Sequence, residues 1–253
     1  MEKWTAPVLA RLNDKAPAFN FTADDVIAMQ EMCGYETVLR GSSAFCSTDL
    51  FSPDEWLSFE YSEDIFYHYA VGYGNELSGP IGFPWVNETL NLLSADKASQ
   101  DLYISFTHRE LPPTVLVAMG LFNNSEFGGA NINSTFPLNQ INYNRAWVSS
   151  YVLPFLTNIA IERMNCSSSY GYENVTDPFY RVLVNQSPQT LPGCSDGPLE
   201  SCSSQGLQSY LSEREAMFGD FCEKCNTSSK YDNGTNVVSF YTNSQNGTTV
   251  GKK

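Results

Sequence analysis

The sequence is poor in histidine and in basic side chains. Only two histidines, His68 and His108, occur in 253 residues, and 14 lysines and arginines stand against 28 aspartates and glutamates. The formal net charge of -14 would repel nucleic acid or an anionic membrane over most of the surface, so neither is expected as a partner. Any site for a phosphate group must therefore be local.

Long apolar runs are also missing. No stretch reaches the roughly 20 apolar residues of a membrane-spanning helix, and residues 1–6 lack the apolar run of a signal peptide. No Cys/His spacing typical of zinc occurs, so no metal or cofactor is expected. The 42% apolar content is nevertheless enough for a packed core of one large or two small domains.

Glycosylation sequons and cysteines are abundant. Ten Asn-x-Ser/Thr sequons occur, at Asn20, Asn87, Asn123, Asn133, Asn165, Asn174, Asn185, Asn226, Asn233 and Asn246. Sequons are usable only in the secretory pathway, and seven cysteines without zinc spacing suit an oxidising compartment. The sequence therefore predicts a secreted glycoprotein whose leader is not in this chain.

The seven cysteines cannot all pair with one another within this chain, because their number is odd. Two short-range disulfides are expected, Cys33 with Cys46 and Cys194 with Cys202, each contributing about 3 kcal/mol in the chain-entropy model. Cys166, Cys222 and Cys225 are then left over. A leftover cysteine in a secreted protein indicates a free thiol or a partner elsewhere, and a missing N-terminal segment would supply such a partner.

The first third of the chain has helical patterns. Residues 7–32 keep helical apolar spacing with a second start at Thr22. Ser52 precedes Pro53 and two acidic residues, which predicts a helix from there to about Tyr69. Glycines and a proline over residues 72–82 predict a loop before the next helix at about Trp85.

The remainder alternates strand and helix patterns. Residues 102–107 form a β-rich run, and two prolines then open an apolar helix that ends near Met119. Residues 159–164 and 180–184 predict two strands of one sheet, and residues 192–193 a turn. Beyond residue 222 the chain is mostly polar, which predicts a mobile tail. This alternation favours a layered α/β core.

The end of the predicted strand carries the strongest chemical signal. His108, Arg109 and Glu110 place an imidazole, a guanidinium and a carboxyl group before a helix N-terminus, which attracts anions. A phosphate group could bind there. The alternative from composition alone is that His108 and Glu110 merely satisfy backbone groups of a loop.

Several segments resemble a known family. Asp49 to Trp56 is similar to the Asp-x-Phe-x-x-x-Glu-Trp segment of fungal histidine acid phosphatases and phytases. Residues 72–82 resemble that family's glycine-rich loop, and Phe106-Thr107-His108 its His-Asp strand end. Residues 181–185 and 191–194 resemble its late strand and hairpin. The matches keep the family's order from about residue 25 to 222.

This resemblance implies the C-terminal part of a histidine phosphatase fold, a phosphoglycerate mutase-like α/β sandwich with an inserted helical domain. Residues 1–78 would complete the helical domain, residues 79–222 would form the second half of the α/β catalytic domain, and residues 223–253 the tail. The implied activity is metal-independent hydrolysis of small phosphate monoesters, phytate or a broader set. Oligomeric state is left open.

Two departures from the family pattern matter. The usual His-Asp pair is His108-Arg109 here, with the acid at Glu110, an offset also found in the His-Ala-Glu of multiple inositol polyphosphate phosphatases. The resemblance thus implies that His108 stabilises phosphoryl charge and that Glu110 donates the proton, which requires acidic solution. Arg109 is either solvated or a phosphate contact.

The second departure is that the Arg-His-Gly-x-Arg-x-Pro loop, whose histidine becomes phosphorylated, does not occur in this chain. His68 lies in an aromatic stretch without a family match and is expected to be a packed or surface helical residue. Two readings follow. The chain is part of a secreted acid phosphatase and inactive alone, or it is a non-catalytic secreted glycoprotein that serves as a binding or structural module.

Overall fold

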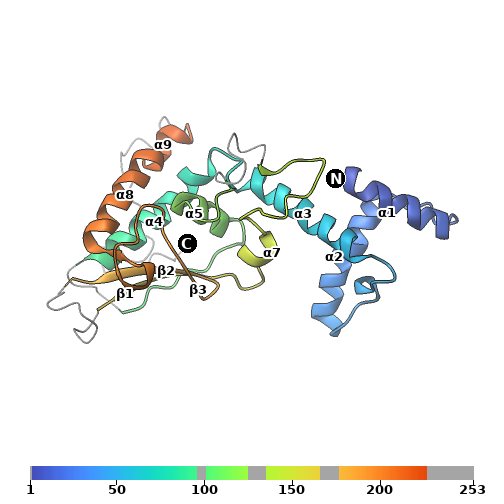
Figure 1. The fold of residues 1–253 in the computed structure, drawn as a ribbon, viewed down its shortest axis with the longest axis horizontal. Coiled ribbons are helices and arrows are strands. Elements are labelled where there is room, and N and C mark those ends of the chain that lie inside the picture. Colours follow the sequence, from blue (N-terminus) through green and yellow to red (C-terminus); the bar gives the residue numbers. More distant parts are fainter. Residues whose placement is uncertain (1, 96–100, 125–134, 166–176, 227–253) are drawn as a thin grey trace, which may run out of the picture.

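The computed structural model of the chain describes residues 2–95, 101–124, 135–165 and 177–226. These residues form an elongated molecule (Figure 1). Helices α1 (Glu2–Lys15) and α2 (Ala23–Arg40) occupy one end, and the long helix α3 (Pro53–Ala70) leads from them to the larger part. The larger part holds the sheet and the other long helices.

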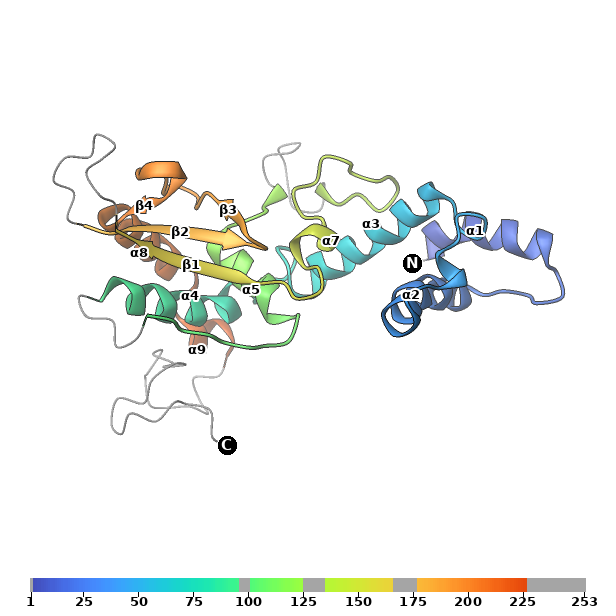
Figure 2. The same ribbon diagram turned by 90° about the horizontal axis from the view of Figure 1, so that it is seen from below.

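The remaining elements follow in chain order. They are η1 (Ala44–Cys46), α4 (Ser78–Ser94), α5 (Leu111–Met119), α7 (Ser149–Val152), β1 (Ile159–Met164), β2 (Phe179–Val184), β3 (Ser187–Gln189), η4 (Pro198–Glu200), β4 (Cys202–Ser203), α8 (Ser204–Phe218) and α9 (Phe221–Lys224). Figure 2 shows the sheet lying over α4 and α8.

Local sequence signals fix the starts of two helices in the first part. Thr22 and Ser52 each accept a hydrogen bond from the backbone N–H three residues later, and Asp25 and Glu55 accept one in return from the capping residue. These reciprocal bonds satisfy N–H groups that a helix start leaves open. A small core of Val8, Leu12, Val26 and Phe51 holds the three helices together. The predicted helix starts at Thr22 and Ser52 are confirmed.

Helix α4 begins earlier than predicted. Gly79, Pro80 and Gly82 were expected in a loop, yet all three lie within the first turns of α4 and are buried. A Cβ atom on Gly82 would stand 2.1 Å from the carbonyl oxygen of Thr114 in α5, and one on Gly79 would stand 2.3 Å from the ring of Phe218. The glycines are present because neighbouring helices approach closely at these positions.

The two predicted strands pair with each other, with β2 at the centre of the sheet and β1 at one edge. β1 and β2 pair antiparallel from Ile159 opposite Val184 to Met164 opposite Phe179, and β3 and β4 both pair with β2. The inner face of the sheet packs on α4, α5 and α8 in a core of 22 buried residues, among them Trp147, Leu116 and Tyr210. This confirms the layered arrangement of helices on a sheet.

Residues 102–107 do not form the predicted strand. They run extended past α4, where the Trp85 indole donates a hydrogen bond to the Ser105 hydroxyl at 3.1 Å. Leu102, Ile104 and Phe106 are 69%, 60% and 95% exposed. A β-rich run forms a strand only where another strand pairs with it, and no described segment does so here. His108 therefore does not follow a sheet strand in this structure.

Helix α3 contributes to both hydrophobic cores. Trp56 near its start packs on the small core, whereas Tyr61 and Tyr67 belong to the large one. The division of the chain at residue 78 stays a prediction.

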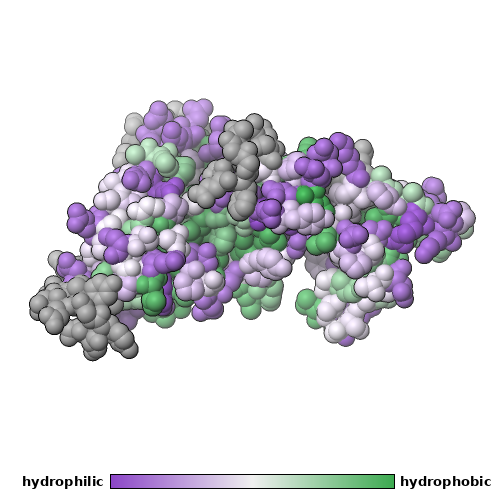
Figure 3. All heavy atoms as spheres, in the orientation of Figure 1, coloured by the Kyte–Doolittle hydropathy of each residue, from purple (hydrophilic) through white to green (hydrophobic). Residues whose placement is uncertain are grey.

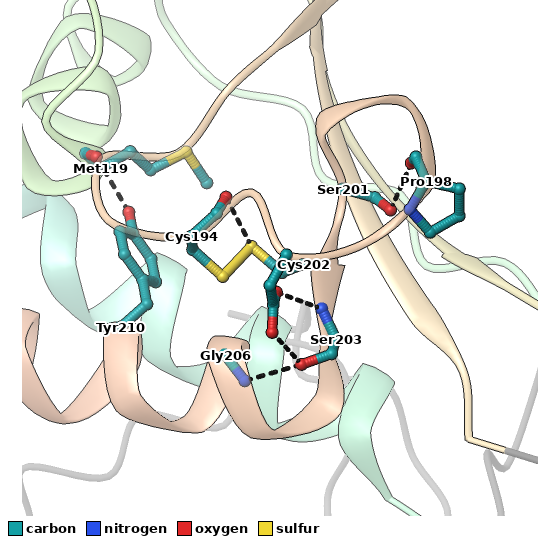
Figure 4. Close-up of a disulfide and its surroundings, with 9 residues drawn as sticks. Met119, Cys194, Pro198, Ser201, Cys202, Ser203, Gly206 and Tyr210 are labelled. Atoms are coloured by element: carbon teal, nitrogen blue, oxygen red, sulfur yellow. Dashed lines mark hydrogen bonds between the residues drawn. A yellow bond between two sulfur atoms is a disulfide. The ribbon is translucent and has the colours of Figure 1, made fainter. Parts of the chain in front are cut away.

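A disulfide closes the hairpin that precedes α8 (Figure 4). It joins Cys194 to Cys202, and the Tyr210 hydroxyl of α8 donates to the Met119 carbonyl at 2.9 Å. The second disulfide joins Cys33 to Cys46. Residues 223 and 224 belong to α9, so the predicted tail begins with helical residues, and residues 227–253 lie outside the described part.

Candidate active site

Helix α5 is the buried platform that carries the residues 108–110. Residues 113–119 of this helix are all buried. Its C-terminal end is fixed by two phenols, because the Tyr210 hydroxyl donates to the Met119 carbonyl and the Tyr73 hydroxyl donates to the Leu121 carbonyl at 2.7 Å. Burial raises the pKa of both phenols, so they remain donors at every physiological pH. The N-terminal end of α5, where His108 lies, is thus held in place from the far end.

The imidazole and the carboxyl group of the candidate site face each other. His108 Nδ1 lies 3.9 Å from Glu110 Oε2, and the two side chains are 98% and 61% exposed. The backbone turns back on itself here, because the Leu111 N–H donates to the His108 carbonyl at 3.2 Å. The structure therefore brings two of the predicted residues together on an open surface.

The start of α5 offers an anion fewer donors than its position suggests. Pro112 and Pro113 have no N–H, and the Leu111 N–H is already bonded to His108. The Glu110 side chain makes no capping bond to the helix. An anion at this helix start would therefore depend on side chains and on the dipole, since the open N–H groups of a typical helix N-terminus are reduced here.

Arg109 is exposed to solvent, but its guanidinium lies over an aromatic ring of α3. Its guanidinium carbon lies 4.7 Å from the centroid of the Tyr67 ring, within the range of a cation–π contact. Tyr67 is only 6% exposed and sits on α3. One turn before it, Glu63 is half-buried, and burial followed by the Glu31 carboxylate raises the pKa of Glu63, while Arg109 acts in the opposite direction.

The other histidine of the chain is buried elsewhere in the aromatic core. His68 is 2% exposed, and its ring lies 4.5 Å from that of Phe136 and 4.8 Å from that of Tyr69. Burial lowers the pKa of His68 to about 4. A side chain so enclosed cannot reach a substrate phosphorus atom, in agreement with its expected role as a packed helical residue.

Sequence reasoning did not identify Tyr67 or Glu63 as neighbours of the site. Their spacing of four residues places them on one face of α3, but nothing local in the sequence indicates that this face meets Arg109. A hollow of about 570 Å³ beside the sheet, whose lining includes Phe122, Arg145 and Val184, does not include residues 108–110.

Six of the ten predicted glycosylation sites lie in the described residues. Asn20, Asn123, Asn165 and Asn226 are exposed, and Asn87 is half-buried on α4. Asn185 differs, because its amide nitrogen donates to the carbonyls of Tyr151 and Val152. Asn133, Asn174, Asn233, Asn246 and also Cys166 lie outside the described residues. Glycosylation at all ten sites stays a prediction.

The described residues also bear on membrane-spanning helices and on metal-binding groups. None of the described helices is long and apolar enough to cross a membrane. Within the described ranges, no group of three or more His, Cys, Asp or Glu side chains is arranged to hold a metal ion.

Comparison with known proteins identifies the family. Residues 1–185 match the histidine phosphatase superfamily (branch 2). The chain is 34% identical over 220 residues to the acid phosphatase PHO1 of Komagataella pastoris, covering 85% of this chain and 43% of that protein. It is 31% identical over 258 residues to phytase A of Penicillium oxalicum, covering 90% of this chain and 52% of the relative.

A solved structure agrees with the sequence matches. The crystal structure of the phytase from D. castellii superposes with a TM-score of 0.80 at 25% identity, covering 95% of this chain and 47% of that one. The chain spans about half the length of the curated relatives it matches. The chain belongs to branch 2 of the histidine phosphatase superfamily, and it has the fold of that family.

Proposed function

We propose that this chain supplies the proton-donor side of the active site of a secreted acid phosphatase that hydrolyses phosphate monoesters. The observation that carries the proposal is the facing pair of His108 and Glu110 at the start of α5, with 3.9 Å between the imidazole and carboxyl atoms. Membership of a family whose relatives are named acid phosphatases and phytases supports the substrate class. Secretion is proposed from the sequons and the cysteines.

The proposed reaction divides between two histidines. A histidine outside this chain attacks phosphorus, and the bond from phosphorus to the ester oxygen breaks as the new phosphorus–nitrogen bond forms. His108 donates a hydrogen bond to the phosphoryl oxygens, where negative charge develops. Glu110 gives its proton to the departing alcohol oxygen and then, as a carboxylate, accepts a proton from the water that hydrolyses the phosphohistidine.

The exposure of the pair fits a site that is incomplete in this chain. A proton donor and a charge-stabilising group act most strongly where water is excluded, and His108 is 98% exposed here. His68 is buried, and the proposal gives His108 the charge-stabilising role, so neither histidine of the described residues is left as the attacking nucleophile. These two observations also keep the rival proposal in consideration, a secreted binding module without catalytic activity.

The first experiment uses the chain as it stands. The purified 253-residue chain should hydrolyse p-nitrophenyl phosphate no faster than its His108→Ala variant, because loss of a member of a catalytic unit costs several orders of magnitude. Turnover that depends on His108 in this chain alone would show that the nucleophile is present after all.

The second experiment tests Glu110 in a chimera that joins this chain to the unmatched part of the Komagataella pastoris acid phosphatase. Glu110→Gln should slow esters with poor leaving groups by roughly 10²- to 10⁴-fold and p-nitrophenyl phosphate far less, because only a poor leaving group needs a proton at bond cleavage. Glu88→Gln, at a half-buried position of α4, serves as the matched control. Equal slowing of both substrates would mean that Glu110 is not the donor. A folded chimera with no His108-dependent activity would favour the binding module.

A further inference from the structure

Arg109 is the one side chain of residues 108–110 with a contact to a distant helix. Its guanidinium lies over the Tyr67 ring at 4.7 Å, although Arg109 is exposed like His108 and Glu110. We infer that Arg109 is a positioning residue, which fastens the loop 108–110 to α3 through the Tyr67 ring and does not bind the substrate phosphate. The inference rests on the proposed function insofar as it assigns a role within that site.

The charges around Arg109 support this role. The Arg109 guanidinium, Glu63 and Glu110 all act electrostatically on the Tyr67 phenol, so the cation stands among two carboxyl groups and a ring face. The Glu63 carboxyl group interacts electrostatically with this guanidinium and offsets part of its positive charge, which lowers its attraction for a phosphate dianion. The same interaction favours a guanidinium that stays on the ring.

The loop has little else to hold it. Within the described residues, the Leu111 N–H bond to the His108 carbonyl is the backbone bond that closes the turn. The Pro112 and Pro113 rings stiffen the chain after the turn but donate no hydrogen bond. Contact of Arg109 with the buried Tyr67 ring therefore adds a second attachment, to α3, beside the link to the buried helix α5, and it restricts the placing of His108 and Glu110.

The consequence for the proposed reaction is specific. Loss of the Arg109 contact should leave phosphate affinity almost unchanged, because no ligand of the phosphate is removed. It should lower the rate of the chemical step, because the imidazole and the carboxyl group are no longer held in one arrangement. A phosphate ligand would show the opposite division, with affinity lost first.

The experiment is a double-mutant cycle in the 253-residue chain, read by NMR hydrogen exchange at the Leu111 amide. Arg109→Ala and Tyr67→Leu should each speed exchange roughly two- to fivefold, the range expected for loss of an exposed cation–π contact. The double variant should be no faster than either single one. Tyr67→Phe, which keeps the ring face, should exchange like the unmodified chain.

Titration with inorganic phosphate, followed at the His108 and Arg109 side-chain resonances, supplies the opposing result. The inference is overturned if Arg109→Ala clearly weakens phosphate binding in the original chain, or if Leu111 exchange does not respond to Arg109→Ala. Arg109 is exposed, so this variant tests the contact even if Tyr67→Leu fails to fold. Absence of phosphate binding at His108 would count against the proposed function alone, since the exchange measurement still decides the role of Arg109.

Discussion

Arg145 should be a position of high sensitivity, because it neutralises a fully buried carboxylate. Arg145 Nε donates to Asp64 Oδ2 at 2.5 Å, and its Nη2 donates to Glu60 Oε2 at 3.0 Å. The guanidinium also lies 5.2 Å from the centroid of the Tyr61 ring. The other oxygen of Asp64 accepts the Ser149 N–H at 2.5 Å, which ties α3 to the start of α7. We predict that Arg145→Met destabilises the folded chain severely.

The size of the effect follows from burial. The side chains of Arg145 and Asp64 are 5% and 0% exposed, so removal of the arginine leaves a carboxylate that water cannot reach. Breaking a buried pair in this way costs about 3–5 kcal/mol, whereas a surface pair contributes about 0–1 kcal/mol. The loss should exceed that of Arg40→Met, which removes an exposed pair with Glu36 at 3.1 Å.

The effect should depend on pH with a definite sign. Burial raises the pKa of Asp64 above the ordinary value of 3.8, with the Ser149 N–H and Arg145 acting against it. A raised pKa means that Asp64 binds its proton more tightly in the folded state than in the unfolded state. The stability that protonated Asp64 contributes is therefore fully present below pH 3.8 and is lost as the pH rises through the pKa of Asp64 in the folded state. Without Arg145 the pKa rises further, and the variant should lose less stability at pH 4.5 than at pH 7.

Urea unfolding followed by tryptophan fluorescence at both pH values is a suitable assay, since the buried Trp147 lies beside this network. The double variant Asp64→Asn with Arg145→Met should recover part of the loss at pH 7, because the buried charge has been removed. The reasoning is wrong if Arg145→Met costs less than about 1 kcal/mol at pH 7, or if the double variant is no more stable than the single one.

Two further stability predictions use the same unfolding assay. Gly82→Ala should cost about 1–3 kcal/mol, because its Cβ would overlap the Thr114 carbonyl, whereas Gly34→Ala in α2 meets nothing within 4 Å and should stabilise by up to about 1 kcal/mol; equal effects would contradict the packing argument. Glu55→Gln should cost about 1 kcal/mol near neutral pH by weakening both the helix cap and the pair with Arg11. Burial acts to raise the pKa of Glu55, but the Arg11 guanidinium helps to lower it below the ordinary 4.5. The stability that ionised Glu55 contributes is therefore present above pH 4.5 and is lost as the pH falls through the folded pKa. An equal loss of stability in Glu55→Gln at pH 7 and at pH 3 would refute this prediction.

Some apolar side chains of the described residues are exposed at the surface. Hydrophobic residues reach the surface around α5 and α7 in Figure 3, among more polar neighbours. Phe155 and Leu156, which follow α7, are 94% and 79% exposed. Helix and strand patterns describe which residues favour burial, and they do not show whether another segment covers an apolar side chain.

Local chemistry is what the sequence determined by itself. The helix starts at Thr22 and Ser52 were predictable because each cap bonds to a residue three positions away. The strands at 159–164 and 180–184 were predictable because each short run contains β-branched residues, and the structure pairs them with each other. The family could be recognised from short segments in the right order, as the match of residues 1–185 bears out.

Contacts between distant segments were decided only by the tertiary structure. A glycine such as Gly79 or Gly82 can indicate a loop or a close contact between helices. Only the close approach of α5 and α8 shows that these two glycines belong to a helix contact. Residues 102–107 have the propensity of a strand but no described partner, and propensity does not supply the hydrogen bonds of a second strand. The placing of Arg109 on Tyr67 is of the same kind, because a cation–π contact depends on where α3 lies in space, and that position is set by the packing of the whole core.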